Sequence, residues 1–193
     1  LSRKSELIRP AVANIDQALV IFAIKKPEPN LNLLDRFLIM MQQKEIPCIL
    51  VFNKSDRATE EEKQALSKVY ENSGCKILFV SAKQNQGIDE VREILEHRTS
   101  TVAGPSGVGK SSLINMLQSN VNMETGSISE KIERGKHTTR HTEFIPIGED
   151  TFIMDTPGFS SLAVFDMEKE ELEQFYPEFD EYRESCRFNG CSH

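Results

Sequence analysis

The chain has 193 residues, with 23 lysines and arginines against 30 aspartates and glutamates, so its formal net charge is −7. This acidic balance excludes a protein whose whole surface is a nucleic-acid footprint, although a local basic patch is still possible. Hydrophobic residues make up 38% of the sequence, enough for a packed core. The four cysteines are too few for a disulfide scaffold, no apolar run is long enough to span a bilayer, and the opening residues do not read as a secretory signal. We therefore expect a cytoplasmic protein with no membrane partner.

Buried strands alternate with helices along the first 120 residues. Continuous apolar runs rich in branched residues predict strands buried on both faces, and apolar residues at a helical period predict helices between them. In chain order we expect a strand over 17–24, a helix over 31–44, a strand over 46–52, a helix over 60–72 with Ala65, Leu66 and Val69 as its apolar stripe, a strand over 76–80, a helix over 88–95, a strand over 99–103 and a helix over 110–118. This alternation predicts an α/β fold with a mostly parallel sheet and helices on both faces.

The regular alternation ends after Ser119. Residues 120–141 are polar and contain two glycines, so we expect a long loop there. An antiparallel hairpin is expected over 143–147 and 151–154, followed by a short acidic helix over 168–175 and a polar tail.

A phosphate-binding loop follows the strand expected over 99–103. Its residues match the pattern G-x4-G-K-[S/T] between a strand and a helix, and they are Gly104, Pro105, Ser106, Gly107, Val108, Gly109, Lys110 and Ser111, with Ser112 next. The glycines let backbone N–H groups turn towards a β-phosphate, and the helix N-terminus adds its positive dipole end. Lys110 can bridge the β- and γ-phosphates, and Ser111 can hold Mg²⁺.

A second phosphate-side motif, Asp155-Thr-Pro-Gly158, follows the last strand of the hairpin. An aspartate at the carboxyl end of a strand can hold Mg²⁺, directly or through water, and the Gly158 N–H can reach a γ-phosphate. The D-x-x-G pattern is weak alone, but the phosphate loop upstream strengthens it.

Two further motifs end the second and third strands and predict a guanine site. In Asn53-Lys54-Ser55-Asp56, the carboxylate can accept both N–H donors of guanine, the Lys54 stem can cover the base, and Asn53 can tie the loops together. In Ser81-Ala82-Lys83, the backbone can read the guanine O6. Either segment alone could be an ordinary polar turn after a strand.

The four motifs resemble those of the P-loop GTPase superfamily, but the guanine-reading pair precedes the phosphate loop. That order predicts a circular permutation of a Ras-like sheet, because the same sheet forms when the old termini are joined and the chain opens elsewhere. The permutation places whatever follows Gly158 beside a segment that switches with the γ-phosphate in Ras-like proteins.

The polar loop offers two further candidates. Thr139, favoured over Thr138, can coordinate Mg²⁺ through its hydroxyl. Phe159 stands where many GTPases have a water-orienting glutamine, so we take His137 as the candidate catalytic residue that positions water, with a solvated loop histidine as the alternative.

Near the end of the chain, Cys186, Cys191 and His193 have the ligand types and short spacing that suit tetrahedral Zn²⁺. Zinc needs a fourth ligand, and the sequence stops before offering one at this short spacing. Unliganded cysteines are the alternative.

The permuted order, the loop from Arg134 to Thr139, the Asp155–Phe159 motif and the Cys/Cys/His tail together resemble the bacterial ribosome small-subunit-dependent GTPase A family. The resemblance extends over the whole chain and implies GTP or GDP and Mg²⁺ as ligands, Zn²⁺ in the full-length protein, and action late in maturation of the 30S subunit with a GTPase that the subunit stimulates. It implies 16S rRNA as a partner; we also expect a monomer. Members carry an N-terminal OB-fold and a C-terminal zinc domain, so this chain resembles the middle of a longer protein.

We accordingly divide the chain into a linker over 1–14, a permuted GTPase domain over 15–165 and the start of a helical zinc-binding domain over 166–193. Two other functions stay open. One is a nucleotide sensor with negligible hydrolysis, and the other is an ATP-using kinase that shares only the phosphate loop, against which the guanine motifs argue.

Overall fold

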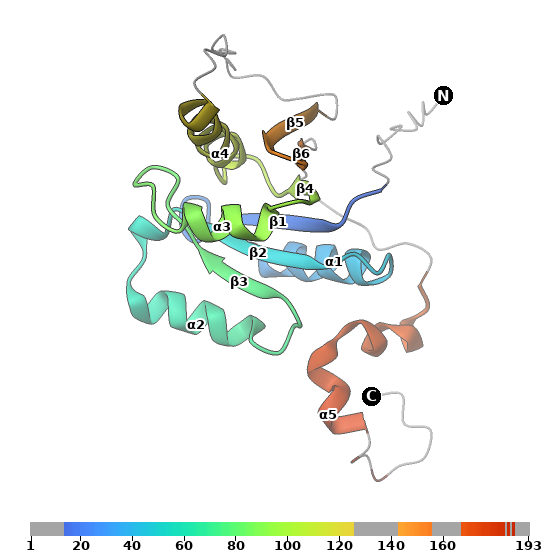
Figure 1. Ribbon diagram of the computed structural model, residues 1–193. Coiled ribbons are helices and arrows are strands. Elements are labelled where there is room, and N and C mark those ends of the chain that lie inside the picture. Colours follow the sequence, from blue (N-terminus) through green and yellow to red (C-terminus); the bar gives the residue numbers. More distant parts are fainter. Residues whose placement is uncertain (1–13, 126–142, 156–166, 184, 186, 188–193) are drawn as a thin grey trace, which may run out of the picture.

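A computed structural model describes residues 14–125, 143–155, 167–183, 185 and 187, and its centre is a six-stranded sheet (Figure 1). The strands are β1 (Gln17–Ala23), β2 (Cys48–Asn53), β3 (Lys76–Phe79), β4 (Thr99–Ala103), β5 (Glu143–Gly148) and β6 (Thr151–Asp155). Their order across the sheet is β3-β2-β1-β4-β6-β5. Every neighbouring pair is parallel except β5 with β6. The mostly parallel sheet and the antiparallel hairpin are both confirmed.

Helices cover both faces of this sheet. The helices α3 (Ile88–Leu95) and α4 (Lys110–Thr125) pack on one face, and α1 (Leu31–Gln42) and α2 (Glu60–Tyr70) pack on the other. The central strand β1 shows why its sequence is continuously apolar. Leu19 and Ile21 lie in the core under α3 and α4, whereas Val20 and Phe22 lie in the core under α1 and α2. Successive side chains of a strand point to opposite faces, and here both faces are dry.

Polar residues fix where α1 and α2 begin. The side chain of Asn30 accepts a hydrogen bond from the N–H of Leu33 at 3.1 Å, which caps α1. Thr59 and Glu62 form a capping box at the start of α2, in which each side chain accepts from the other residue's backbone N–H. These bonds satisfy N–H groups that a helix start leaves unpaired, so both helices begin where the sequence predicted.

Two expectations about helices were wrong. Helix α4 continues to Thr125, so residues 120–125 are helical and not part of a loop, because no glycine or proline interrupts the chain before residue 126. On α2, Ala65 is exposed and Val69 is 54% exposed. Tyr70 is the buried anchor at 3% exposure, with Leu66 packed one turn before it. The core-facing stripe of α2 is therefore rotated from the one we expected.

The described chain ends in short helical turns below α1 and α2 (Figure 1). They are the 3₁₀ helices η2 (Lys169–Phe175) and η3 (Pro177–Phe179) and the single turn α5 (Asp180–Arg183). The acidic helix expected over 168–175 is thus a 3₁₀ helix. Within the described part of the chain, none of the helices has both the length and the apolar character needed to cross a bilayer.

Candidate nucleotide site

The predicted nucleotide-binding loops meet at one edge of the sheet. Parallel pairing of β1 with β2 and β4, and of β2 with β3, directs the carboxyl ends of all four strands to the same side. Ligands of open α/β sheets bind at this edge, in the crevice outside the strand ends. The phosphate loop follows β4, the Asn53–Asp56 loop follows β2 and the Ser81–Lys83 loop follows β3.

Gly104 opens the phosphate loop against the backbone of β1. A Cβ at this position would lie 2.1 Å from the carbonyl oxygen of Ile21, so no larger residue fits without moving the strand. The close approach brings the loop over the carboxyl end of β1, and α4 begins at Lys110 immediately after it. The backbone N–H groups of the loop are thus held next to a helix N-terminus, where an anion is favoured.

Lys110 is half-buried within the loop. Its ammonium donates to the carbonyl oxygens of Gly104 and Pro105, both at 2.9 Å. Burial lowers the pKa of Lys110, and the negative charge of Asp155 opposes that shift. An ammonium that has lost part of its hydration and whose hydrogen bonds go to neutral carbonyls is suited to pair with a phosphate.

Asn53 joins the three loops. Its amide nitrogen donates to the carbonyl oxygen of Val108 at 3.0 Å, and more weakly to that of Gly109 at 3.5 Å. Its amide oxygen accepts from the N–H of Lys54 at 2.8 Å and of Ala82 at 3.2 Å. The side chain is only 2% exposed, so these bonds form in a site largely closed to water. The prediction that Asn53 ties the loops together is confirmed by these contacts.

The same bonds restrict the Ala82 N–H, which lies in the segment predicted to read a guanine O6. It is already engaged with Asn53, so it can contact a base only by sharing that bond or releasing it. Gly109 approaches Asn53 so closely that a Cβ there would lie 2.3 Å from the amide nitrogen. The last glycine of the phosphate loop is therefore needed for the contact between the two halves of the site.

Asp56 lines a small cavity. One of its carboxylate oxygens accepts a hydrogen bond from the Ser81 hydroxyl at 2.6 Å, and this bond is the main reason that the pKa of Asp56 is lowered. The carboxyl group is thus held ionised as an acceptor. The cavity has a volume of about 110 Å³ and is lined by Asn53, Lys54, Asp56, Arg57, Ala82, Lys83, Gly109 and Ser112.

Lys54 spans the site from the Asn53–Asp56 loop to the phosphate loop. Its backbone is left-handed, with φ of 62°, and its ammonium donates to the carbonyl oxygen of Gly107 at 2.7 Å and to that of Lys26. The contact with Lys26 brings the β1–α1 connection to the site, which the sequence motifs did not predict. Arg57 was also missed as a lining residue, and only its position next to Asp56 could have suggested it.

The residues predicted to hold Mg²⁺ are placed differently. Ser111 is exposed at the first turn of α4, whereas Asp155 ends β6, is 3% exposed and lies close enough to influence the pKa of Lys110. A hydroxyl and a carboxylate beside a phosphate loop are the oxygen donors that Mg²⁺ takes. The other candidates lie outside the described residues, namely His137, Thr139, Gly158, Cys186, Cys191 and His193.

The fold and these loops define a P-loop GTPase fold in which the Asn53–Asp56 and Ser81–Lys83 loops come before the phosphate loop, which is a circularly permuted order. Comparison with known proteins identifies the family. The RsgA GTPase family model matches residues 1–165, and the chain belongs to that family.

Two curated relatives are named small ribosomal subunit biogenesis GTPase RsgA. That of Agathobacter rectalis is 63% identical over all of this chain and 64% of its own length, and that of Clostridium perfringens is 48% identical over 99% of this chain and 66% of its own length. The chain therefore spans slightly less than two thirds of the length of these relatives.

Two solved structures are similar to the whole chain. YjeQ from Thermotoga maritima matches with a TM-score of 0.74 and 33% identity, covering 65% of that protein. YloQ, described as a circularly permuted GTPase, matches with a TM-score of 0.69 and 34% identity, covering 62% of that protein. Both matches confirm the permuted fold predicted from the order of the motifs.

Proposed function

We propose that this chain binds GTP and GDP at the edge formed by the three loops, and that it hydrolyses GTP with Mg²⁺. The observation that carries the proposal is the bonding of Asn53, which couples the carbonyl of Val108 in the phosphate loop to the N–H of Ala82 beside the guanine loop. Such a link makes one continuous site from a phosphate cradle and a base pocket. An ATP-using kinase would have no need of the Asp56 carboxylate in the base pocket.

The residues divide the work between charge and position. Lys110 would neutralise the β- and γ-phosphates, and Ser111 and Asp155 would hold Mg²⁺, which supplies further positive charge to the phosphates. Asp56 would accept the two N–H donors of guanine, covered by the stem of Lys54. We retain His137 for water positioning, with Thr139 and Gly158 at the γ-phosphate, as proposals from the sequence.

We also propose that the chain acts in biogenesis of the small ribosomal subunit, late in 30S maturation, with hydrolysis stimulated by the subunit. The curated names of the relatives support this role, as does membership of the family. Contact with 16S rRNA, a cytoplasmic location, a monomeric state and a Zn²⁺ site at Cys186, Cys191 and His193 are further parts of the proposal. Among the described residues, no cluster of histidine, cysteine or acidic side chains could hold a metal ion.

Base selectivity is the first test. We expect the chain to bind a fluorescent GTP analogue at least about tenfold more tightly than the ATP analogue, because loss of a paired polar contact costs at least about 1.4 kcal/mol. Asp56→Asn should weaken GTP and leave ATP unchanged. Glu93→Gln on α3, which removes an exposed carboxylate that does not line the Asp56 cavity, is the matched control. Equal binding of GTP and ATP by the unaltered chain would contradict the guanine site.

Hydrolysis is the second test. Single-turnover release of phosphate from bound GTP should be slow for the chain alone and faster when purified 30S subunits are titrated in. Lys110→Ala should abolish release in both conditions. If GTP binds but no phosphate is released at any concentration of subunits, the chain is a nucleotide sensor and the enzymatic part of the proposal is wrong. His137→Ala separates a role in water positioning from a solvated loop histidine, because only the former changes the rate while binding persists.

A further inference from the structure

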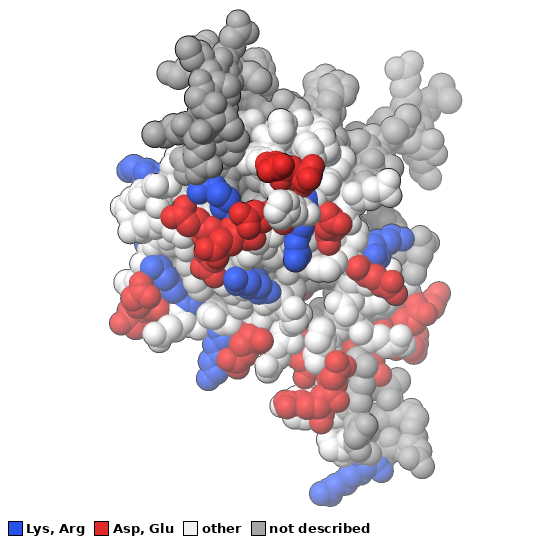
Figure 2. Space-filling model, viewed as in Figure 1, with Lys and Arg blue, Asp and Glu red and all other residues white. Residues whose placement is uncertain are grey.

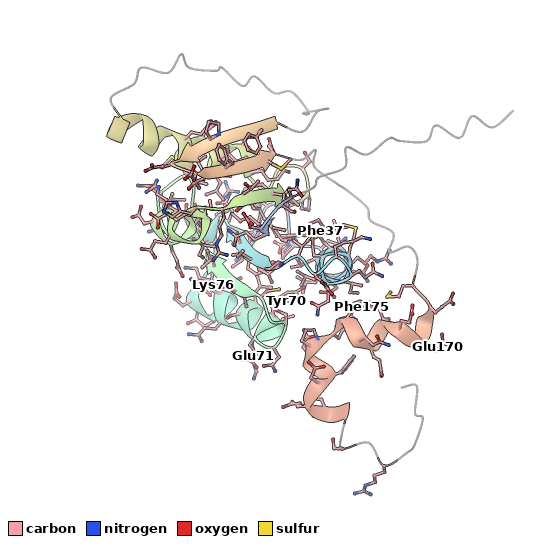
Figure 3. All side chains as sticks on the ribbon, turned by 45° about the vertical axis from the view of Figure 1, so that its right-hand side comes forward. Phe37, Tyr70, Glu71, Lys76, Glu170 and Phe175 are labelled. Atoms are coloured by element: carbon pink, nitrogen blue, oxygen red, sulfur yellow. The ribbon has the colours of Figure 1, made fainter. Side chains whose placement is uncertain are left out.

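A second cavity lies at the amino ends of β2 and β3, whereas the nucleotide site lies at the carboxyl ends of the strands. It has a volume of about 260 Å³ and lies between α1, the start of β2, the turn from α2 to β3, and the 3₁₀ helices η2 and η3. Cys48 and Cys75 stand at the amino ends of β2 and β3 and both line it. Figure 3 labels Tyr70 of α2 and Phe175 of η2, which both line the cavity. The cavity therefore lies where the C-terminal turns meet the rest of the fold.

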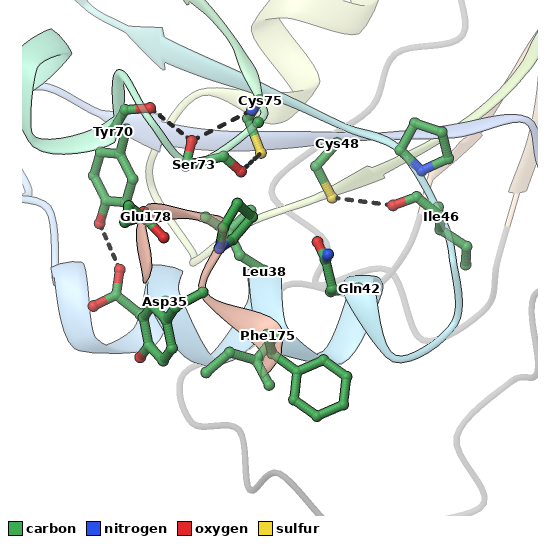
Figure 4. Close-up of a pocket in the computed structure, with 15 residues that line it drawn as sticks. Asp35, Leu38, Gln42, Ile46, Cys48, Tyr70, Ser73, Cys75, Phe175 and Glu178 are labelled. Carbon is green, nitrogen blue, oxygen red and sulfur yellow. Dashed lines mark hydrogen bonds between the residues drawn. The ribbon is translucent and has the colours of Figure 1, made fainter. Parts of the chain in front are cut away.

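Two carboxylates lie on one side of this cavity, as Figure 4 shows. Asp35 accepts a hydrogen bond from the hydroxyl of Tyr70 at 2.8 Å, and burial raises the pKa of this carboxyl group. Glu178 places one carboxylate oxygen, Oε2, out of reach of solvent and without a hydrogen-bond partner in the described chain. Within that same part of the chain, no lysine, arginine or histidine lines the cavity. A buried carboxylate oxygen without a partner is costly, and a cation held in the cavity beside the Asp35 and Glu178 carboxylates would lower that cost through its charge.

The surface around the cavity is acidic, like the cavity itself. Residues 167–183 contain seven aspartates and glutamates against one lysine and one arginine. Figure 2 shows acidic side chains along this C-terminal part of the molecule. Large apolar side chains are exposed among them, with Leu172 at 39%, Phe179 at 48% and Tyr182 at 60%. Aromatic side chains surrounded by acidic ones suit arginine and lysine, which bind carboxylates and also lie on aromatic faces.

We propose that this surface, formed by the cavity at Asp35 and Glu178 together with the exposed aromatic residues Phe179 and Tyr182, docks a basic segment of a partner protein. One arginine or lysine side chain of the partner enters the cavity, and neighbouring basic residues contact the acidic rim. RNA does not fit this surface, because its phosphates would meet seven carboxylates within 17 residues. The surface is separate from the nucleotide loops, so the inference does not depend on GTP hydrolysis.

The test uses a fluorescein-labelled nonapeptide of alternating arginine and glycine, titrated with the full chain and followed by fluorescence anisotropy. The double variant Asp35→Asn, Glu178→Gln removes both cavity charges, and the amide introduced at position 35 retains an oxygen that can accept from Tyr70. The matched control is Glu93→Gln, Glu96→Gln, which removes two exposed charges from α3 and its C-terminal end on the other face of the sheet. We expect the cavity variant to bind at least about tenfold more weakly and the control less than twofold more weakly. Tyr182→Ala should weaken binding without altering either carboxylate.

Several outcomes would overturn the proposal. Equal losses in the two double variants would mean that the peptide binds any acidic face. The proposal would also be rejected if the unaltered chain does not bind the peptide. It would be rejected if the chain prefers a uridine oligonucleotide and Tyr182→Ala weakens that binding. Sedimentation showing that this surface joins two copies of the chain would reject it as well. Thermal unfolding of the cavity variant confirms that it is folded. Binding of the GTP analogue should be unchanged in that variant, so failure here is distinct from failure of the nucleotide site.

Discussion

Replacing Asn53 with alanine tests whether one side chain holds the nucleotide site together. The change removes three hydrogen bonds of 2.8–3.2 Å and leaves the Val108 carbonyl and the Ala82 N–H without these partners, in residues 1% and 7% exposed. A hydrogen bond contributes about 0.5–1.5 kcal/mol net, and an orphaned buried group costs about 1–3 kcal/mol. We therefore expect the free energy of unfolding to fall by about 2–4 kcal/mol.

The affinity of Asn53→Ala for GTP should also fall, by at least about tenfold, because GTP binding must then order loops that Asn53 no longer fixes. Urea unfolding gives the first quantity and titration of a fluorescent GTP analogue gives the second. Asn53→Asp separates the two sides of the side chain, since it keeps the oxygen that accepts from Lys54 and Ala82 but places a negative charge against the Val108 carbonyl. Gln84→Ala, an exposed change in the neighbouring loop, should alter stability by less than about 0.5 kcal/mol. Unchanged stability and affinity in Asn53→Ala would refute the reasoning.

Three further changes probe the packing and charge of the fold. In Ser81→Ala the loss of the hydroxyl donor should raise the pKa of Asp56. As the pH is lowered, the affinity of this variant for GTP should therefore begin to fall at a higher pH than that of the unaltered chain. Titrations of GTP binding between pH 7 and 4 would show the difference. Gly104→Ala should destabilise the chain by about 1–3 kcal/mol in urea, because the new methyl group overlaps the strand beside it, whereas Ser106→Ala in the same loop is exposed and should have little effect. Gln17→Ala should lower the free energy of unfolding by about 2–3 kcal/mol, because the buried amide of Gln17 forms hydrogen bonds with Ser100, Arg98 and the carbonyl of residue 94. Thermal unfolding would detect this loss of stability. A fall in the melting temperature of less than about 1 °C would contradict the prediction.

The sequence predicted where the loops of the candidate site lie in the fold, because each loop depends on residues close together in the chain. Strand β1 reads as a buried strand from its own apolar run, and Lys110 is placed by the glycines just before it. What the sequence missed depends on contacts between distant residues. The cavity at the far edge brings together positions 35, 70 and 178, and the burial of Tyr70 instead of Val69 is decided by how α2 rotates against the sheet. No local pattern contains that information.

The arrangement of the strands explains why the order of the motifs can be permuted without dispersing the site. The loops meet because β4 lies parallel to β1, which lies parallel to β2, so their carboxyl ends are neighbours whichever strand comes first in the chain. At the amino ends of these strands, Asp16 exchanges two hydrogen bonds with the backbone of Thr99, at 2.8 and 2.7 Å, and thereby fixes the entry of β1 beside the start of β4. The sheet thus positions the chemistry at one edge, while bonds at the other edge hold the permuted chain in register with it.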